Sequence, residues 1–252
     1  MKEGQVLKTK EGHKLIYDIY LGDNNYIVFL GGLGSDRKAT KASYFKEYCQ
    51  QKGYSYIRFD YLGHGDSDLS FSSCDINMWL ANVFAILHNL VPQQAILIGS
   101  SLGGWLALRA AEQNSKKIKA IIGLAAAADF TEELMWRDFS EQIKAELKAG
   151  KIYNLPSDYC DGTYAISMGL IESGRENLLL SKNNIKVNLP VRLVQGMQDK
   201  DVPYSYAYRI IEKLATDDAE LLLLKNADHR LSCPNILAKI TQILENLITT
   251  NI

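Results

Sequence analysis

A serine lies in a pattern that can make it a nucleophile. Residues 99–103 read Gly-Ser-Ser-Leu-Gly, a G-x-S-x-G pattern, between the apolar run 95–98 and the apolar stretch 104–111. A strand, a sharp turn and a helix in this order lift a serine hydroxyl above the edge of a sheet. We therefore take Ser101 as the candidate nucleophile. A tight turn without chemistry is the alternative, because this spacing arises by chance in about one chain in ten of this length.

A serine hydroxyl needs an imidazole to take its proton, and the chain has four histidines. His229 follows the predicted strand 220–224 and precedes the predicted helix 234–248, which places it at the same sheet edge as Ser101. His64, between two glycines, is the alternative base. His13 falls in an exposed hairpin and His88 on the solvated side of a helix. We expect His229 to be the general base.

An acid must then hold the imidazole in the correct tautomer. Asp199 follows the predicted strand 191–195, at the edge expected for Ser101 and His229. Asp201 and Asp129 also qualify by position, whereas Asp228 would have to fold back onto its own neighbour. We favour Asp199. The resulting chain order of serine, aspartate and histidine is the order of α/β-hydrolases.

Backbone N–H groups are the expected donors to an oxyanion. One belongs to Leu102, directly after the candidate nucleophile, and the other to Leu33 in the glycine-rich loop 31–35. Loss of one such donor typically costs about 3 kcal/mol of transition-state stabilisation. A phosphate-binding loop would need the sequence G-x-x-x-x-G-K-[ST], which is absent here, and a plain turn is the remaining alternative.

The elements that position these residues alternate along the chain. An N-terminal hairpin over 5–21 precedes apolar runs at 26–30, 54–59, 95–98, 119–125, 191–195 and 220–224, and amphipathic helical stretches separate most of them. Strands that alternate with helices favour a mainly parallel central sheet flanked by helices. The sequence predicts one α/β domain over 1–252.

The alternation breaks over 129–188, which we interpret as an inserted helical cap above the active-site edge. A helix pair is expected near Thr131–Trp136 and Ser140–Leu147, with a less regular run up to Asn188. Apolar side chains of the cap could line a pocket or form the cap's own core. They are Met135, Trp136, Phe139, Tyr164, Met168, Leu170 and Ile171.

Composition excludes several functional classes. The 252 residues carry a net charge of −1 with mixed signs, so no nucleic-acid or membrane-surface partner is expected. The four cysteines (Cys49, Cys74, Cys160 and Cys233) are isolated, and no metal or organic cofactor is indicated. No targeting peptide or membrane span is apparent, so a cytoplasmic location is expected. The oligomeric state is left open.

These motifs together resemble the α/β-hydrolase superfamily. More closely, the chain is similar to abhydrolase-domain enzymes described as mitochondrial palmitoyl-protein thioesterases and acyl-glucuronide esterases. The matching runs are 29–33, 57–65, 99–106, 196–203 and 228–230. The resemblance implies a catalytic triad of Ser101, Asp199 and His229. Gly31 departs from it, since such relatives often have proline or histidine there, and the cap is the part least alike.

The sequence therefore predicts a serine hydrolase that cleaves carboxylic esters or thioesters through an acyl-enzyme. Its substrate would be a small molecule or an acylated partner. A hydrolase of carbon–carbon bonds with the same triad is one alternative. The other alternative is a non-catalytic binding module that keeps the three triad residues without using them for catalysis.

Overall fold

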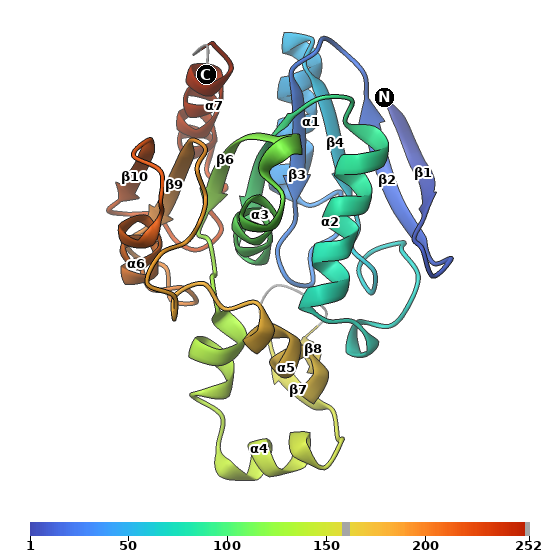
Figure 1. The fold of residues 1–252 in the computed structure, drawn as a ribbon, viewed down its shortest axis with the longest axis vertical. Coiled ribbons are helices and arrows are strands. Elements are labelled where there is room, and N and C mark those ends of the chain that lie inside the picture. The colour runs from blue at the N-terminus through green and yellow to red at the C-terminus, as the bar shows by residue number, and fades with distance from the viewer. Residues whose placement is uncertain (158–161, 250–252) are drawn as a thin grey trace.

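The computed structural model describes residues 1–157 and 162–249, which form one large sheet with helices on both faces and a smaller group of elements beyond one end (Figure 1). The eight-stranded sheet has the order β1-β2-β4-β3-β5-β6-β9-β10. β2 is antiparallel to both of its neighbours, and all other neighbouring strands are parallel. The strands are β1 (Lys2–Lys8), β2 (Lys14–Tyr20), β3 (Tyr26–Leu30), β4 (Ser55–Phe59), β5 (Ala95–Ser100), β6 (Ile118–Leu124), β9 (Val191–Gly196) and β10 (Ala219–Leu224).

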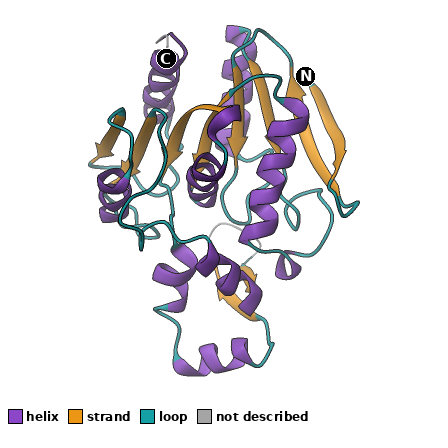
Figure 2. Cartoon of the chain, viewed as in Figure 1, coloured by secondary structure: helices purple, strands orange, loops and turns teal. Residues whose placement is uncertain are grey.

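Helices cover the two faces of the sheet (Figure 2). Successive residues of a strand pack into two separate hydrophobic cores. In β3, Val28 packs with the tryptophans of α2 and α3, whereas Ile27 packs with α1 and α7. This alternation explains why the strand reads as a continuous apolar run. The mostly parallel α/β-hydrolase sheet predicted from the sequence is confirmed. The helices are α1 (Thr40–Lys52), α2 (Ile76–Leu90), α3 (Leu102–Gln113), α6 (Ser205–Lys213) and α7 (Pro234–Thr249).

The chain between β6 and β9 forms the smaller group, at the lower end of Figure 1, and we call residues 129–188 the cap segment. A π-helical turn, η3 (Thr131–Trp136), and α4 (Glu141–Lys148) occupy the stretches expected to be helical. The following stretch is more regular than expected. It contains an antiparallel hairpin of β7 (Tyr153–Pro156) and β8 (Thr163–Ile166), and then α5 (Met168–Glu176). Strands of four residues are too short to give an alternating pattern that can be recognised.

A buried ionic cluster fixes the loop that follows β3. The guanidinium of Arg37 contacts Asp18 at 3.1 Å, Asp60 at 2.5 Å and Asp66 at 2.7 Å, and Arg58 contacts Asp18 at 2.9 Å. Arg37, Arg58, Asp18 and Asp60 are all buried, so each charge depends on its partners. The cluster joins the loop 31–39 to β2 and to the end of β4.

Two of the cysteines are buried thiols that are held in the neutral form. Cys49 and Cys74 are free and buried, and burial raises the pKa of Cys49 to about 12 and that of Cys74 to about 11. Cys233 is free and exposed, and Cys160 lies outside the described residues. No helix within residues 1–157 and 162–249 is both long and apolar enough to cross a bilayer.

Candidate active site

Ser101 lies at the turn between β5 and α3 in a strained backbone conformation. Its φ of 53° and ψ of −113° fall where residues other than glycine are rarely found. The Ser101 N–H donates to Leu124 O at 2.9 Å, and Ser101 O accepts from Ala127 N at 3.1 Å. A Cβ atom at Gly103 would overlap the carbonyl oxygen of Leu30, so the turn needs glycine there. The surrounding chain thus holds the serine at the carboxyl end of β5.

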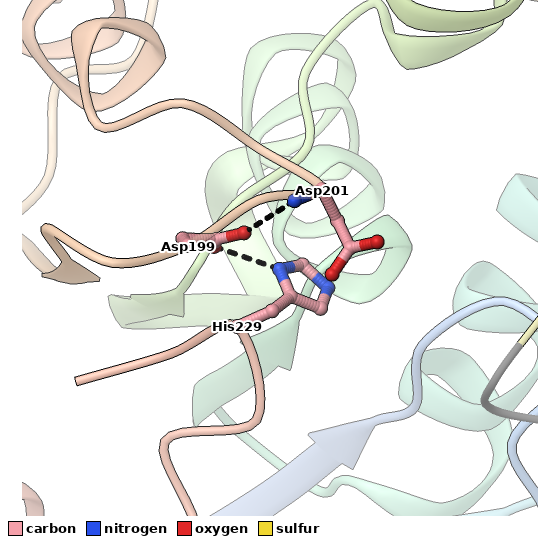
Figure 3. A group of neighbouring side chains, drawn as sticks. All are labelled: Asp199, Asp201 and His229. Atoms are coloured by element: carbon pink, nitrogen blue, oxygen red, sulfur yellow. Dashed lines mark hydrogen bonds and ion pairs between the residues drawn. The ribbon is translucent and has the colours of Figure 1, made fainter.

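His229 and Asp199 form a hydrogen-bonded pair at the same sheet edge (Figure 3). Nδ1 of His229 is 2.8 Å from Oδ2 of Asp199, whose side chain is fully buried. The carboxylate also accepts from the N–H groups of Asp201 at 2.9 Å and Val202 at 2.8 Å, and from the side-chain amide of Gln195 at 2.8 Å. Because a carboxylate can only accept, the Nδ1 atom carries the hydrogen and Nε2 is left as the basic nitrogen.

The other acids that qualified by position have different surroundings. Asp129 is buried and accepts from the N–H groups of Leu179 and Leu180, at 2.8 and 2.7 Å. It therefore joins the start of the cap segment to the later part of the same segment. Asp228 accepts from the N–H of Arg230 at 3.2 Å. The carboxylate of Asp201 points toward the edge of the imidazole that holds Nε2 (Figure 3). Nδ1 of His229 donates its hydrogen bond to Asp199 and not to any of these acids.

Asp199, Asp201 and His229 also have the side-chain types that bind metals, and their ligating atoms lie within 4.8 Å of one another. However, the Asp199 carboxylate already accepts hydrogen bonds from Gln195, Val202, Asp201 and His229. A metal would have to displace several of these bonds. The donor set therefore fits a buried acid that orients an imidazole better than it fits a cation site.

The glycine-rich loop after β3 lies against Ser101. A Cβ atom at Gly32 would be 3.5 Å from Ser101 Cβ, and Leu33 follows at once. Within the described parts of the chain, neither the N–H of Leu33 nor that of Leu102 donates a hydrogen bond to the protein. The hydroxyl of Tyr164, in β8, donates to Leu33 O at 3.1 Å, and its ring stacks on Phe71 at 6.0 Å. The hydrogen bond from Tyr164 thus joins the cap segment directly to the loop after β3.

Ser101 and His229 both line a cavity of about 450 Å³. Its size suits a small molecule or an acyl chain. Of the apolar cap residues considered from the sequence, Met135 and Tyr164 line it, while Phe139, Leu170 and Ile171 are buried in the core and Trp136 and Met168 pack against that core. The larger apolar side chains of Phe130, Leu134 and Leu155 also line the cavity and were not expected to do so from the sequence.

His64, the alternative base, lies in an aromatic cluster and not in this cavity. Its ring packs against Tyr61, Phe71 and Trp79 with centroid distances of 5.6, 5.4 and 5.2 Å. Nδ1 is 3.3 Å from Leu62 O, and Nε2 has no hydrogen-bond partner within the described residues. Burial lowers the pKa of His64 to about 4, although the contact with Leu62 O acts in the opposite direction. A histidine held neutral in this way packs as an aromatic side chain.

Acid should therefore destabilise the protein through His64. The unfolded chain has the ordinary histidine pKa near 6.5, so it binds the proton more readily than the folded chain. This contribution to stability is constant above about pH 6.5 and is lost as the pH falls toward 4, by about 3 kcal/mol in total. Urea unfolding of the wild type and of His64→Phe at both ends of this range measures it. Equal pH dependence in the two proteins would contradict the assignment.

Comparisons with known proteins agree with the fold. Residues 25–151 match the family described as alpha/beta hydrolase fold. The chain is 34% identical over 218 residues to the palmitoyl-protein thioesterase ABHD10, mitochondrial, of Bos taurus, which covers 86% of this chain and 71% of that protein. The structure of mouse alpha/beta hydrolase domain-containing protein 10 matches with a TM-score of 0.88 at 32% identity, over 97% of each chain. A putative hydrolase from Agrobacterium vitis matches with a TM-score of 0.90 at 31% identity, over 96% of each chain.

Proposed function

Because the chain belongs to the α/β-hydrolase family and is a hydrolase of carboxylic esters or thioesters, we propose that it works through an acyl-enzyme on Ser101. The observation that carries this proposal is the hydrogen bond of 2.8 Å between His229 Nδ1 and Asp199, together with the cavity that His229 shares with Ser101. A serine, an imidazole and a buried carboxylate in this relation are the parts of a catalytic triad.

Acylation begins when Nε2 of His229 takes the proton of Ser101 Oγ, which attacks the carbonyl carbon of the substrate. The carbonyl oxygen becomes an oxyanion and accepts hydrogen bonds from the N–H groups of Leu33 and Leu102. Their lack of another partner within the described residues supports this role. When the intermediate collapses, His229 gives the proton to the departing alcohol or thiol, and the acyl group stays on Ser101.

Deacylation repeats these steps with water. His229 takes a proton from a water molecule, whose oxygen attacks the acyl carbon, and then returns that proton to Ser101 Oγ as the acid leaves. The imidazole is charged at both intermediates. Asp199, buried beside Nδ1, stabilises that charge and keeps the ring in the tautomer with a basic Nε2.

We propose that the cap segment holds the acyl group. The cavity wall on that side is formed by Phe130, Leu134, Met135 and Leu155, which offer an apolar surface to a hydrocarbon chain. The palmitoyl-protein thioesterase name of the ABHD10 relatives is consistent with a long acyl chain. A cytoplasmic location stays a prediction, since those relatives are named as mitochondrial.

Acyl-chain profiling tests this function. Thioesters and p-nitrophenyl esters from acetyl to palmitoyl should be cleaved with kcat/KM rising by up to about fourfold per added methylene, because each buried CH₂ contributes about 0.8 kcal/mol. The rise should stop once the cavity is filled. Labelling of Ser101 by a fluorophosphonate, read by mass spectrometry, checks the nucleophile. Absence of Ser101-dependent turnover at every chain length would refute the ester and thioester assignment.

A further inference from the structure

Gln195 has a polar side chain in an apolar part of the sheet. It is the one polar side chain of β9, residues 191–196, that is buried, and only 1% of its surface is exposed. Leu193 precedes it by two residues, on the same face of the strand, and packs in the hydrophobic core beside α2 and α3. A buried amide has to find its hydrogen-bond partners within the protein, because water does not reach it.

The amide nitrogen of Gln195 finds these partners beside the imidazole. Nε2 donates to Asp199 Oδ2 at 2.8 Å and to Val202 O at 3.1 Å. Both oxygens can only accept, so the nitrogen of the amide and not its oxygen faces them. Oδ2 is also the atom that lies 2.8 Å from Nδ1 of His229. Oδ1 of Asp199 instead accepts from the backbone N–H groups of Asp201 and Val202. Within the described residues, Oδ2 is thus held by Gln195 and His229.

The amide oxygen of Gln195 has the opposite situation. Oε1 is buried, and no hydrogen-bond partner for it lies in residues 1–157 and 162–249. A buried acceptor without a partner lowers the stability of the folded state. An apolar side chain of the same length would avoid this loss. The stability of β9 therefore does not account for a glutamine at this position, whereas the bond from Nε2 to Asp199 does.

We propose that Gln195 is a positioning residue of the reaction, which acts through Asp199 by holding Oδ2 against Nδ1 of His229. This inference rests on the proposed function. Two N–H groups hold Oδ1, and the neutral amide adds an attachment at Oδ2 without a further charge. The plane of the carboxylate is thereby fixed relative to the imidazole. Because the imidazole is charged only at the intermediates, a misaligned Oδ2 would weaken those states and leave substrate binding unchanged.

Gln195→Met tests the proposal, because methionine keeps the length of the side chain and removes the amide. We expect kcat on a p-nitrophenyl ester to fall about 30-fold, as the loss of a hydrogen bond to a charged group allows. KM should stay within about twofold, since Gln195 does not line the cavity. Leu193→Met is the matched control. It makes the same replacement on the same face of β9, touches no donor of Asp199 and should retain the wild-type kcat. Turnover is expressed per folded protein, which urea unfolding curves measure.

A double-mutant cycle with Asp199→Asn separates positioning from a general effect on the fold. In that background Gln195→Met should lower kcat by less than about threefold, because the carboxylate through which it acts is gone. An equal loss in both backgrounds would overturn the proposal. So would a wild-type kcat in Gln195→Met, or a loss in Leu193→Met as large as that in Gln195→Met. Failure of the proposed function gives a different result, in which Asp199→Asn alone retains the wild-type kcat or turnover does not depend on Ser101.

Discussion

Replacing Ser101 by alanine is expected to lower kcat by about 10⁶-fold, because no acyl-enzyme can form without Oγ. The fold should survive, since alanine keeps the Cβ and the N–H and C=O groups that bond to Ala127 and Leu124. Single-turnover assays on a p-nitrophenyl ester measure the loss, and circular dichroism checks the fold. A residual rate over water should remain from binding and from the N–H groups of Leu33 and Leu102.

Ser115→Ala is the control for this substitution. Ser115 lies at the far end of α3, in the short turn before β6, and it does not line the cavity. Its variant should retain wild-type turnover and fluorophosphonate labelling, whereas Ser101→Ala should lose both. If Ser101→Ala kept turnover within about tenfold of the wild type, the nucleophile would be another group and the acyl-enzyme mechanism would be wrong.

Asp199→Asn is expected to lower kcat by about 10⁴-fold with little change in KM. The asparagine amide can donate to Nδ1 of His229, which would favour the tautomer with hydrogen on Nε2, and that nitrogen would then be unable to accept the serine proton. The variant also loses the negative charge that stabilises the imidazolium. Steady-state kinetics on the preferred acyl chain give kcat and KM separately, and unfolding curves exclude a loss of folded protein.

Asp201→Asn makes the matching change two residues along the same loop. Asp201 faces the Nε2 side of His229, and its side chain is exposed (Figure 3). Removal of its charge should alter kcat by at most about tenfold, since partly solvated charges interact weakly. If Asp201→Asn were the more damaging of the two substitutions, Asp201 and not Asp199 would be the acid of the triad.

The central sheet and its edge could be predicted because strong local signals coincide there. The run 95–98 reads as a buried strand, the glycines at 99 and 103 permit the turn, and strand ends bring Asp199 and His229 to one edge. Parallel strands place their carboxyl ends together. The positions of Asp199 and His229 after their strands were therefore sufficient to predict that both lie at one edge of the sheet. The hydrogen bond between Asp199 and His229 agrees with that reasoning.

The cap segment was harder to predict because its structure depends on tertiary contacts. The hairpin of β7 and β8 has only four residues per strand, and Leu155 and Leu134 face the cavity from two different elements. Neither carries a periodic signal that separates a pocket wall from a core. The cluster around Arg37 was also missed, since its acids are spread from residue 18 to residue 66 and only the fold brings them together.

The bond from the Tyr164 hydroxyl to Leu33 O bears on how new specificities can arise on this scaffold. The cap segment lines the cavity beside Ser101, and Tyr164 also supports the loop that carries Leu33, the proposed oxyanion donor. An exchange of the whole segment for that of another hydrolase would therefore change substrate choice and disturb the catalytic loop at once. Variation should be tolerated more readily at Leu134 or Leu155, which line the cavity and form no hydrogen bond with that loop within the described residues. Divergence within the family is thus expected to proceed by single wall residues around a retained tyrosine.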